Sequence, residues 1–285
     1  MKTVLTSLLL SLTIWVVAQN NAPFFRGAGT MGEGNHVSTT LGIQSLFGNP
    51  AGLCHLDGFS FYAGAENKYE LIDLTAYQMA FALPVEKWGV FGLNMIDFGG
   101  SLYRDQKIGL AYARNLTKNF ALGLQFDWMI MEIEHYGLRH RFTFDVGIQT
   151  RLTDKLLLGF HLFSPYPMGF DSERIVPTYA SVGLVYRVSQ QVELKAEVQK
   201  QTYESPGLHI GLQYNLMKSF GLSLGMTTNT GHAMISSGFS YQFPVGLKID
   251  FGMNFHQSLG ISSGIGFGYQ FRKKSSGGLS SVESD

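Results

Sequence analysis

The stretch that decides the fold runs Leu247-Lys248-Ile249-Asp250-Phe251-Gly252-Met253-Asn254-Phe255-His256. Its apolar and polar residues alternate without a break. Side chains on a β-strand point alternately to the two faces of the sheet, so this segment has one apolar face and one polar face. The apolar face carries Leu, Ile, Phe, Met and Phe, and the polar face carries Lys, Asp, Gly, Asn and His. This pattern is typical of a strand with lipid on one side and a wet interior on the other.

About fourteen segments between residues 59 and 271 alternate in this way, one after another. A length of about 11 residues suits a tilted strand that crosses a bilayer. The sequence therefore predicts an all-β fold, a transmembrane antiparallel β-barrel of about 14 strands with a short N-terminal helical plug segment. A water-soluble sandwich or a smaller barrel also alternates, but it places its aromatic residues inside and its charges outside. We expect strands at 59–67, 74–84, 89–98, 105–115, 120–133, 139–151, 156–163, 178–187, 192–202, 207–216, 219–228, 232–243, 245–257 and 260–271.

The predicted polar faces carry charges of both signs. Opposite charges on neighbouring strands can pair across a lumen, whereas an open pore is expected to have one sign at its constriction. The mixture favours a filled or plugged interior. The charged residues expected in the lumen are Glu66, Lys107, Asp127, Arg139, Arg141, Asp145, Glu193, Lys195, Glu197, Lys248 and Asp250.

The first residues resemble an export signal. Met1-Lys2-Thr3 is followed by an apolar run over 4–18 that ends in Val16-Val17-Ala18. A positive start, a short apolar core and a small residue at the cut are typical of a secretory signal peptide, here 1–18. We therefore expect the mature protein to leave the cytoplasm.

The remaining chain divides into three parts. Residues 19–57 lack the alternation, and we expect them to form a plug segment, with a short helix over 38–47 capped by Ser38 or Thr39. Residues 58–271 are the predicted barrel. Residues 272–285 are a Ser/Gly-rich polar tail, expected to be disordered in the periplasm.

The connections between the predicted strands alternate in length. Tight ones such as 86–88 alternate with longer ones such as 99–105, 134–138 and 164–177. Outer-membrane barrels have short periplasmic turns and longer outer loops. This pattern places both termini in the periplasm.

Composition agrees with a barrel in lipid. The mean hydropathy is near neutral at +0.06, as expected when lipid-facing and lumen-facing residues average out. The net charge of zero argues against nucleic acid as a partner. The 34 glycines show no collagen-like period and fit close approaches and small lumen-facing positions. Cys54 is the only cysteine, so no internal disulfide is expected.

Two short motifs match enzyme signatures without the context that gives them meaning. Residues 27–32 read G-x-G-x-x-G, but a dinucleotide site needs a preceding strand and a βαβ unit. Residues 221–225 read G-x-S-x-G, but Ser223 falls within a predicted strand rather than on a strand-to-helix turn.

The eight histidines show no metal-ligand spacing on one strand face, and His161, His209 and His256 are expected in the lumen. We expect no catalytic residue, no cofactor and no metal, although a lipid-acting barrel enzyme with a Ser/His pair stays an alternative.

The segment before the strands resembles a known group of proteins. Arg26-Gly27-Ala28-Gly29-Thr30-Met31-Gly32, followed by Leu46-Phe47-Gly48-Asn49-Pro50-Ala51-Gly52-Leu53, is similar to the start of FadL-type hydrocarbon transporters and of the PorV/PorQ proteins of type IX secretion. The resemblance implies a Gram-negative outer-membrane barrel with an N-terminal element inside. It also implies a plug motif made by Gly27, Gly29, Gly32, Asn49, Pro50, Ala51 and Gly52.

Two functions follow from the resemblance. The chain is too short for the large outer loops that capture substrate in FadL-type transporters, which favours a non-enzymatic PorV/PorQ-like accessory barrel. Its partners would be outer-membrane lipid and other proteins of a secretion or surface-attachment complex. The alternative is a FadL-like passive route for a small hydrophobic molecule. This alternative would show an apolar lumen pocket and a lateral gap in the wall, with Gly92, Pro84 and Pro177 as candidate gap-makers.

Overall fold

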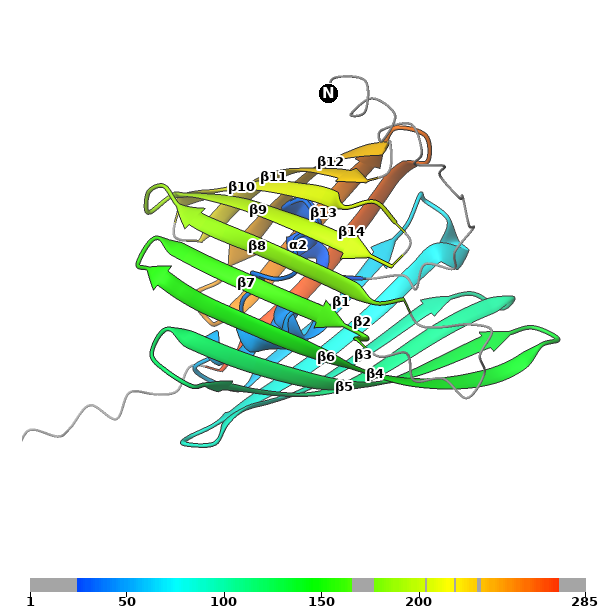
Figure 1. The fold of residues 1–285 in the computed structure, drawn as a ribbon. Helices are drawn as coiled ribbons and strands as arrows, with labels where there is room; N and C mark the ends of the chain where they lie inside the picture. Colours follow the sequence, from blue (N-terminus) through cyan, green and yellow to red (C-terminus); the bar gives the residue numbers. More distant parts are fainter. Residues whose placement is uncertain (1–24, 166–176, 203, 218, 230–231, 272–285) are drawn as a thin grey trace, which may run out of the picture.

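The computed structural model describes residues 25–165, 177–202, 204–217, 219–229 and 232–271. Within these ranges fourteen strands close into one antiparallel barrel, each paired with its neighbours in sequence, and β1 paired with β14 (Figure 1). The strands are β1 (Ser60–Asn67), β2 (Thr75–Val85), β3 (Gly89–Gly99), β4 (Tyr103–Asn115), β5 (Phe120–Ile133), β6 (Gly137–Thr153), β7 (Leu156–Phe163), β8 (Tyr179–Arg187), β9 (Val192–Gln201), β10 (Gly207–Met217), β11 (Phe220–Asn229), β12 (His232–Gln242), β13 (Leu247–His256) and β14 (Gly260–Gln270).

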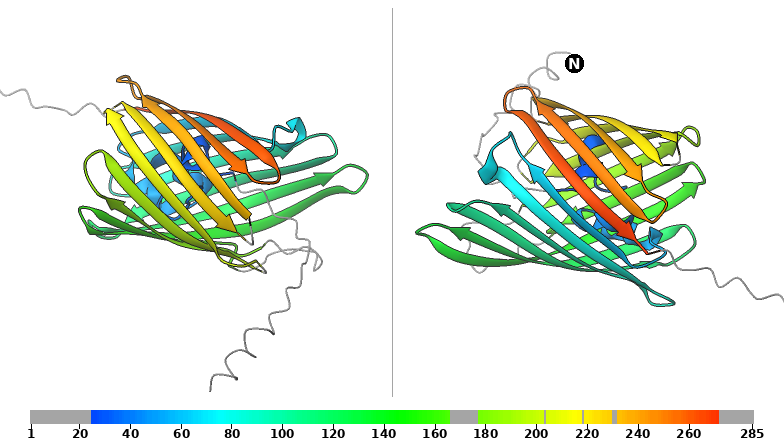
Figure 2. Two further views of the ribbon diagram at one scale, coloured as in Figure 1. Left: turned by 90° about the horizontal axis from the view of Figure 1, so that it is seen from above. Right: turned by 180° about the vertical axis from the view of Figure 1, so that it is seen from behind.

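The predicted strands are confirmed, most of them to within one or two residues at each end. The connections 99–105 and 134–138 were predicted too long, because β4 begins at Tyr103 and β6 at Gly137. As a result β6 is 17 residues long, whereas its neighbour β7 has 8. The β5–β6 hairpin therefore extends beyond the rest of the barrel rim (Figures 1 and 2). We call this rim the loop end, and the rim with the tight turns, such as 86–88, the turn end.

The two faces of the wall are inverted relative to a soluble protein. On β9, Val198 is 50% exposed on the outside, whereas Glu197 is 1% exposed on the inside. On β5, Phe126 is 48% exposed and Asp127 is 0% exposed. Apolar residues outside and buried polar residues inside are what a barrel in lipid requires. The face assignment made from the alternation is therefore confirmed, and the soluble alternative is not.

Aromatic side chains gather at the turn end of the barrel. Phe59 contacts Phe271 with ring centroids 5.5 Å apart, and Phe91 contacts Tyr112 at 5.2 Å. Trp88, which is 68% exposed, lies in the β2–β3 turn of the same rim. Aromatic girdles of this kind mark the membrane–water interface in outer-membrane barrels.

Residues 25–57 form a plug inside the barrel (Figures 1 and 2). They contain the helix α2 (Ala28–Gly32) and the 3₁₀ helices η1 (Gly42–Phe47) and η2 (Pro50–His55). Helix α2 contacts β11–β14 and β1, whereas η1 contacts β1–β3 and η2 contacts β3–β6. The plug therefore reaches both sides of the lumen. A further short 3₁₀ helix, η3 (Ile72–Leu74), lies in the β1–β2 connection.

The helix predicted over 38–47 is shorter than expected. It begins at Gly42 as η1, and its N-cap is Leu41, which offers no side-chain cap. Ser38 does not cap it, because the Ser38 hydroxyl and backbone N–H both donate to Glu197 in the wall. The predicted signal peptide 1–18 and the predicted tail 272–285 lie outside the described residues. No helix in the described part of the chain is long and apolar enough to cross a membrane.

Candidate functional site

The plug lies directly against glycines on the inner face of the wall. A Cβ atom placed on any of six of them would lie 1.9–2.4 Å from a plug atom, far inside contact distance. Only glycine permits such an approach of two backbones. The six wall glycines, each with the plug residue it meets, are Gly123 (Ala51), Gly147 (Asn49), Gly159 (Ser38), Gly211 (Glu33), Gly225 (Gly34) and Gly252 (Ala28).

The glycines of the predicted plug motif also lie at close approaches, Gly32 against the wall and Gly29 against another part of the plug. A Cβ on Gly32 would lie 2.7 Å from the Cα of Gly238 and from Oγ of Ser223. A Cβ on Gly29 would lie 2.8 Å from Oε1 of Gln44. Gly27 has a positive φ of 88°. Ser223 lies within β11 and faces the plug, so it has no nucleophile-elbow geometry.

Asn49 joins the plug to β6 and β7. Its Nδ2 donates to the backbone oxygens of Ile148 and Phe160 at 3.1 Å, and also to the carbonyl of Ser38. Its Oδ1 accepts from the N–H of Ala51 at 3.0 Å and so caps η2. Pro50 occupies the first turn of η2, where a missing N–H costs nothing. Pro50, Ala51 and Gly52 are all buried, and a Cβ on Gly52 would meet Thr40 O at 2.1 Å.

Two buried carboxylates of the wall hold the plug backbone. Glu197 on β9 accepts from the N–H of Val37 and from the N–H and hydroxyl of Ser38, at 2.6–3.0 Å. Glu66 on β1 accepts from the N–H of Gly27 at 2.7 Å. Hydrogen bonds to an ionised acceptor are about twice as strong as neutral ones. Glu66 and Glu197 therefore hold the plug at the two ends of residues 27–38.

Most of the predicted lumen charges do lie inside and are paired. Four of the contacts are ion pairs or hydrogen bonds at the following distances: Lys195 with Glu33 (2.6 Å), Lys248 with Asp250 (2.9 Å), Asp250 with Gln44 (2.8 Å) and Lys107 with Asp127 (3.5 Å). His161 Nε2 lies 3.6 Å from Asp145 Oδ2. Arg141 lies 4.0 Å from Asp105, and Glu193 bonds Arg187 at 3.0 Å near the turn end. Arg139 instead is exposed near the tip of the β5–β6 hairpin. The mixed charges thus accompany a filled lumen, as the sequence indicated.

His161, His209 and His256 lie in different surroundings. His161 and His209 are buried in the lumen, and His209 Nδ1 lies 2.7 Å from the carbonyl oxygen of Gly34. His256 instead accepts from two backbone N–H groups of the β13–β14 turn. Among the described residues no three His, Cys, Asp or Glu side chains converge in a metal-binding group.

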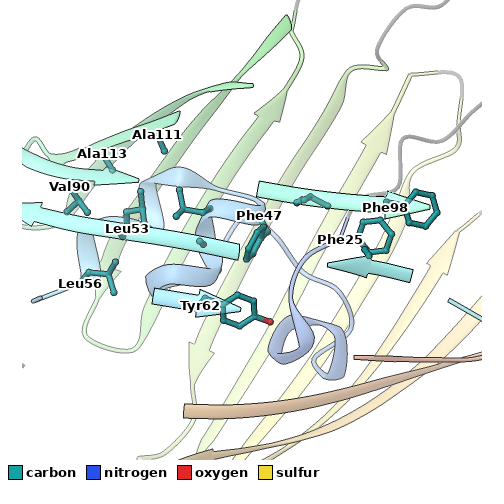
Figure 3. Close-up of a cluster of buried hydrophobic side chains, with 14 residues drawn as sticks. Phe25, Phe47, Leu53, Leu56, Tyr62, Val90, Phe98, Ala111 and Ala113 are labelled. Carbon is teal, nitrogen blue, oxygen red and sulfur yellow. The ribbon is translucent and has the colours of Figure 1, made fainter. Parts of the chain in front are cut away.

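On one side of the lumen apolar plug residues pack against apolar positions of β1–β4, among which the buried polar side chains of Glu66, Gln78 and Asn94 also lie. We call the apolar cluster the apolar track. Plug residues pack there against the inner faces of β1–β4, whose side chains are mostly small (Figure 3). Phe25 contacts Phe98 with centroids 4.9 Å apart, and Phe47 contacts Tyr62 at 5.5 Å. The buried members are Phe25, Leu46, Phe47, Leu53, Leu56, Tyr62, Ala76, Ala80, Ala82, Val90, Ile96, Phe98, Ala111 and Ala113.

Each end of the apolar track reaches a cavity. At the loop end Phe98 lines a cavity of about 380 Å³, the loop-end cavity, together with Lys68, Tyr69 and Met31. At the turn end Leu56 and Val90 line a groove of about 700 Å³ beside Cys54. The track therefore runs between openings on the two sides of the plug.

The sequence did not reveal the wall glycines as contacts of the plug, nor the division of the lumen into an apolar and a polar side. The predicted gap at Gly92 is wrong. The ladder of β3 with β2 and β4 is continuous there, with Gly92 opposite Ala82 and Ala111. Gly92 serves packing, since a Cβ on it would lie 2.6 Å from Leu46. Pro84 likewise stays within its ladder, opposite Val90.

Comparison with known proteins identifies the fold. No protein-family model matches the chain, and no curated protein does either. Among solved structures, it resembles the Ralstonia pickettii toluene transporter TbuX at 12% identity, covering 86% of this chain and 98% of that one, with a TM-score of 0.71. The P. putida toluene transporter TodX aligns at 12% identity over 88% of this chain and 99% of that one (TM-score 0.71). A Pseudomonas aeruginosa FadL homologue aligns at 13% identity over 86% and 98% (TM-score 0.65).

These likenesses establish the architecture. The chain has the closed barrel of the FadL-type outer-membrane proteins. The neighbours named above are two toluene transporters and a FadL homologue, and at 12–13% identity the likeness concerns the fold.

Proposed function

We propose that this protein is a passive outer-membrane channel for small hydrophobic molecules, of the FadL-like kind. The observation that carries the proposal is the apolar track, which joins the loop-end cavity to the turn-end groove along β1–β4. An apolar solute gains by leaving water for such a surface. In this proposal the loop end faces the outside and the turn end faces the periplasm.

The plug must yield for a molecule to pass, and the track is the side on which it yields most readily. Plug residues there, such as Leu46 and Leu53, contact the wall mainly through apolar side chains. An apolar solute replaces such contacts with contacts of the same kind, because dispersion and burial are not directional. Single hydrogen bonds also hold the plug on this side, from Gly27 N–H to Glu66 and from Asn94 Nδ2 to the Leu46 carbonyl. On the opposite side the plug is held by directional hydrogen bonds to Glu197. The solute would therefore move between the plug and β1–β4 while Glu197 retains the plug.

The wall is unbroken along the track, so the proposed route ends in the turn-end groove rather than in the bilayer. Each strand from β1 to β4 is paired with its neighbours without a register shift. The groove lies at the rim, where Phe59 and Phe271 also line it. A small apolar molecule would leave there toward the periplasm.

Uptake by intact Gram-negative cells that lack their own hydrophobic-molecule channels tests this proposal. Wild-type protein should accelerate uptake of radiolabelled toluene, and Ala80→Trp should abolish the gain because it fills the track. Ala80 is fully buried on the inner face of β2. Ala196→Trp is the matched control, since Ala196 lies on the outer face of β9. Equal uptake by wild type, Ala80→Trp and cells without the protein would refute the proposal.

The accessory role in secretion stays the second candidate. The protruding β5–β6 hairpin, with Tyr136 83% exposed at its tip, is the surface that would meet a protein partner. Deleting residues 134–136 should then release co-purifying proteins in mild detergent while toluene uptake is retained.

A further inference from the structure

The polar side of the lumen holds two cavities that face each other across a single turn of the plug. The first is the loop-end cavity, of about 380 Å³. The second, of about 230 Å³, opens toward the turn end, and we call it the turn-end chamber. The turn between them is Glu33-Gly34-Asn35-His36, which we call the septum. Asn35 lines the loop-end cavity, whereas Glu33 and His36 line the turn-end chamber.

The septum is one layer of chain thick. On β9, Gln199 lines the loop-end cavity and Lys195 lines the turn-end chamber, four positions away. On β10, His209 and Gln213 are in the same relation. Four residues of a strand span about 13 Å, and strand tilt shortens the distance along the barrel axis. Between these positions Gly211 meets the backbone of Glu33.

Polar contacts hold the septum in place. The Gly34 carbonyl accepts from Thr227 Oγ1 at 2.9 Å and lies 2.7 Å from His209 Nδ1. Lys195 Nζ bonds Glu33 Oε2 at 2.6 Å. Water can replace each of these partners, so the net loss per bond on opening is small. Asn35 has a positive φ of 58°, which residues other than glycine adopt uncommonly. Gly34 has a φ of 85°, which glycine adopts readily, so neither residue adds a strong backbone preference for the closed septum.

The charge around the turn-end chamber favours anions. Five Lys or Arg side chains line it, against three Asp or Glu: Arg151, Lys155, Arg187, Lys195 and Lys248, with Glu33, Asp154 and Glu193. Lys195, Arg187 and Lys248 are in ion pairs with Glu33, Glu193 and Asp250, so the excess of positive charge comes from Arg151 and Lys155 against Asp154. Burial, together with the charge of Lys195, lowers the pKa of His36 to about 3, so this side chain is neutral at pH 7. Burial also lowers the pKa of His55. The histidines therefore leave the excess of positive charge unchanged.

We infer that this side of the barrel is a second route, which shares the loop-end cavity with the apolar track and passes small hydrated anions along the other side of the plug when the septum shifts. The anion enters the loop-end cavity, passes between the septum and β9–β11, and leaves through the turn-end chamber. The apolar contacts of η1 and η2 with β1–β6 stay in place during this opening. The inference stands whether or not hydrophobic molecules use the apolar track.

Conductance of single barrels in planar bilayers tests the inference. In a potassium chloride gradient, wild-type protein should show brief steps whose reversal potential reports chloride preferred over potassium. Gly34→Ala should raise the open time about five- to thirty-fold, the population ratio that corresponds to the usual cost of a side chain in a left-handed conformation. Its added Cβ would also lie 2.5 Å from the Ile210 carbonyl oxygen. Lys195→Glu should lower the preference for chloride.

Gly137→Ala is the matched control. Gly137 also has a positive φ, of 83°, but a Cβ on it would have no atom within 4 Å. Gly137 lies at the start of β6, far from the septum. A heat-dependent gel shift verifies that each variant is a folded barrel, and Lys195→Glu carries the test if Gly34→Ala fails to fold. The inference is overturned if wild type gives no steps, if Gly34→Ala conducts no more than Gly137→Ala, or if the steps prefer potassium.

Discussion

Gly147→Ala is expected to detach the plug from the middle of the wall. The new methyl group would lie 1.9 Å from Oδ1 of Asn49 and 2.9 Å from Cδ of Pro50. Ordinary contact begins at about 3.4 Å, so Asn49 must move by roughly 1.5 Å. A shift of that size breaks the hydrogen bonds from Asn49 to the carbonyl oxygens of Ile148 and Phe160.

The expected magnitude follows from those two bonds. Each contributes about 1 kcal/mol net, and a buried amide left without a partner costs about 1–3 kcal/mol more. The docked state of the plug should lose about 3–5 kcal/mol in total. That loss corresponds to a rise of roughly 100- to 4,000-fold in the ratio of detached to docked plug.

Cys54 provides the assay, because it is a free thiol near the end of η2, the 3₁₀ helix that Asn49 caps. Burial raises the pKa of this thiol to about 11 from an ordinary 9.0. Only the thiolate reacts with a maleimide, so at pH 8 the docked plug reacts slowly. Return of the pKa to its ordinary value on detachment increases the thiolate fraction by up to about 100-fold. Gly147→Ala should therefore label at least tenfold faster than wild type.

Gly268→Ala is the control, since a Cβ there would meet its nearest atoms at an ordinary 3.9 Å. It should label at the wild-type rate. If Gly147→Ala also labels at that rate while remaining a folded barrel, then the wall glycines do not hold the plug and the reasoning fails.

Three further outcomes are expected. Glu197→Gln replaces a carboxylate that accepts from several plug N–H groups by an amide, whose NH₂ group must itself donate. The substitution should weaken docking of the plug by about 3 kcal/mol and so speed Cys54 labelling. Unchanged labelling would contradict the role given to Glu197. Val198→Arg puts a charge on the lipid face, where it should cost about 2–4 kcal/mol in a urea titration of folding into vesicles. Leu152→Arg, on the outer face at the turn end, where Leu152 is 55% exposed, should cost at most about 1 kcal/mol, and equal costs would contradict the membrane placement. Unheated wild-type protein should migrate differently from boiled protein on a gel, and a single position for both would argue against a barrel.

The strands were predictable because their signal is local. In β13 the period of two is complete from Leu247 to His256, and the face it assigns to Asp250 is the buried face. Lipid outside and polar side chains inside reinforce the same alternation on every strand, so boundaries shifted little. The rim was less predictable. Whether β6 starts at Gly137 or a few residues later depends on pairing with β5, which no local pattern reports.

The plug was predictable only in outline. Its glycines and the Asn49–Gly52 motif pointed to close packing, but the partners of that packing lie far along the chain. Gly123 meets Ala51, and Gly147 meets Asn49, across nearly a hundred residues in the second case. One signal was available and unused: a glycine recurs near the middle of the inward face on strand after strand. Such a row of positions without side chains indicates backbone lying on the wall.

The apolar track was hidden for a different reason. Its wall residues on β2–β4 are mostly alanines, such as Ala80, Ala82 and Ala111, which read as small lumen positions in any barrel. Their meaning depends on the plug side chains that cover them, Leu46 and Leu53 among them. Gly92, interpreted from sequence as a gap in the wall, belongs to this packing.

Photolabelling in intact cells tests the central claim most directly. A small aliphatic diazirine, activated by light in cells that contain the protein, should label inward-facing residues of β2 and β3 and the plug segment Gly42–His55. Excess unlabelled toluene should suppress this labelling, and Ala80→Trp should remove it. Labelling confined to lipid-facing residues such as Tyr77 and Phe91, unaffected by toluene or by Ala80→Trp, would contradict a hydrophobic route through the lumen.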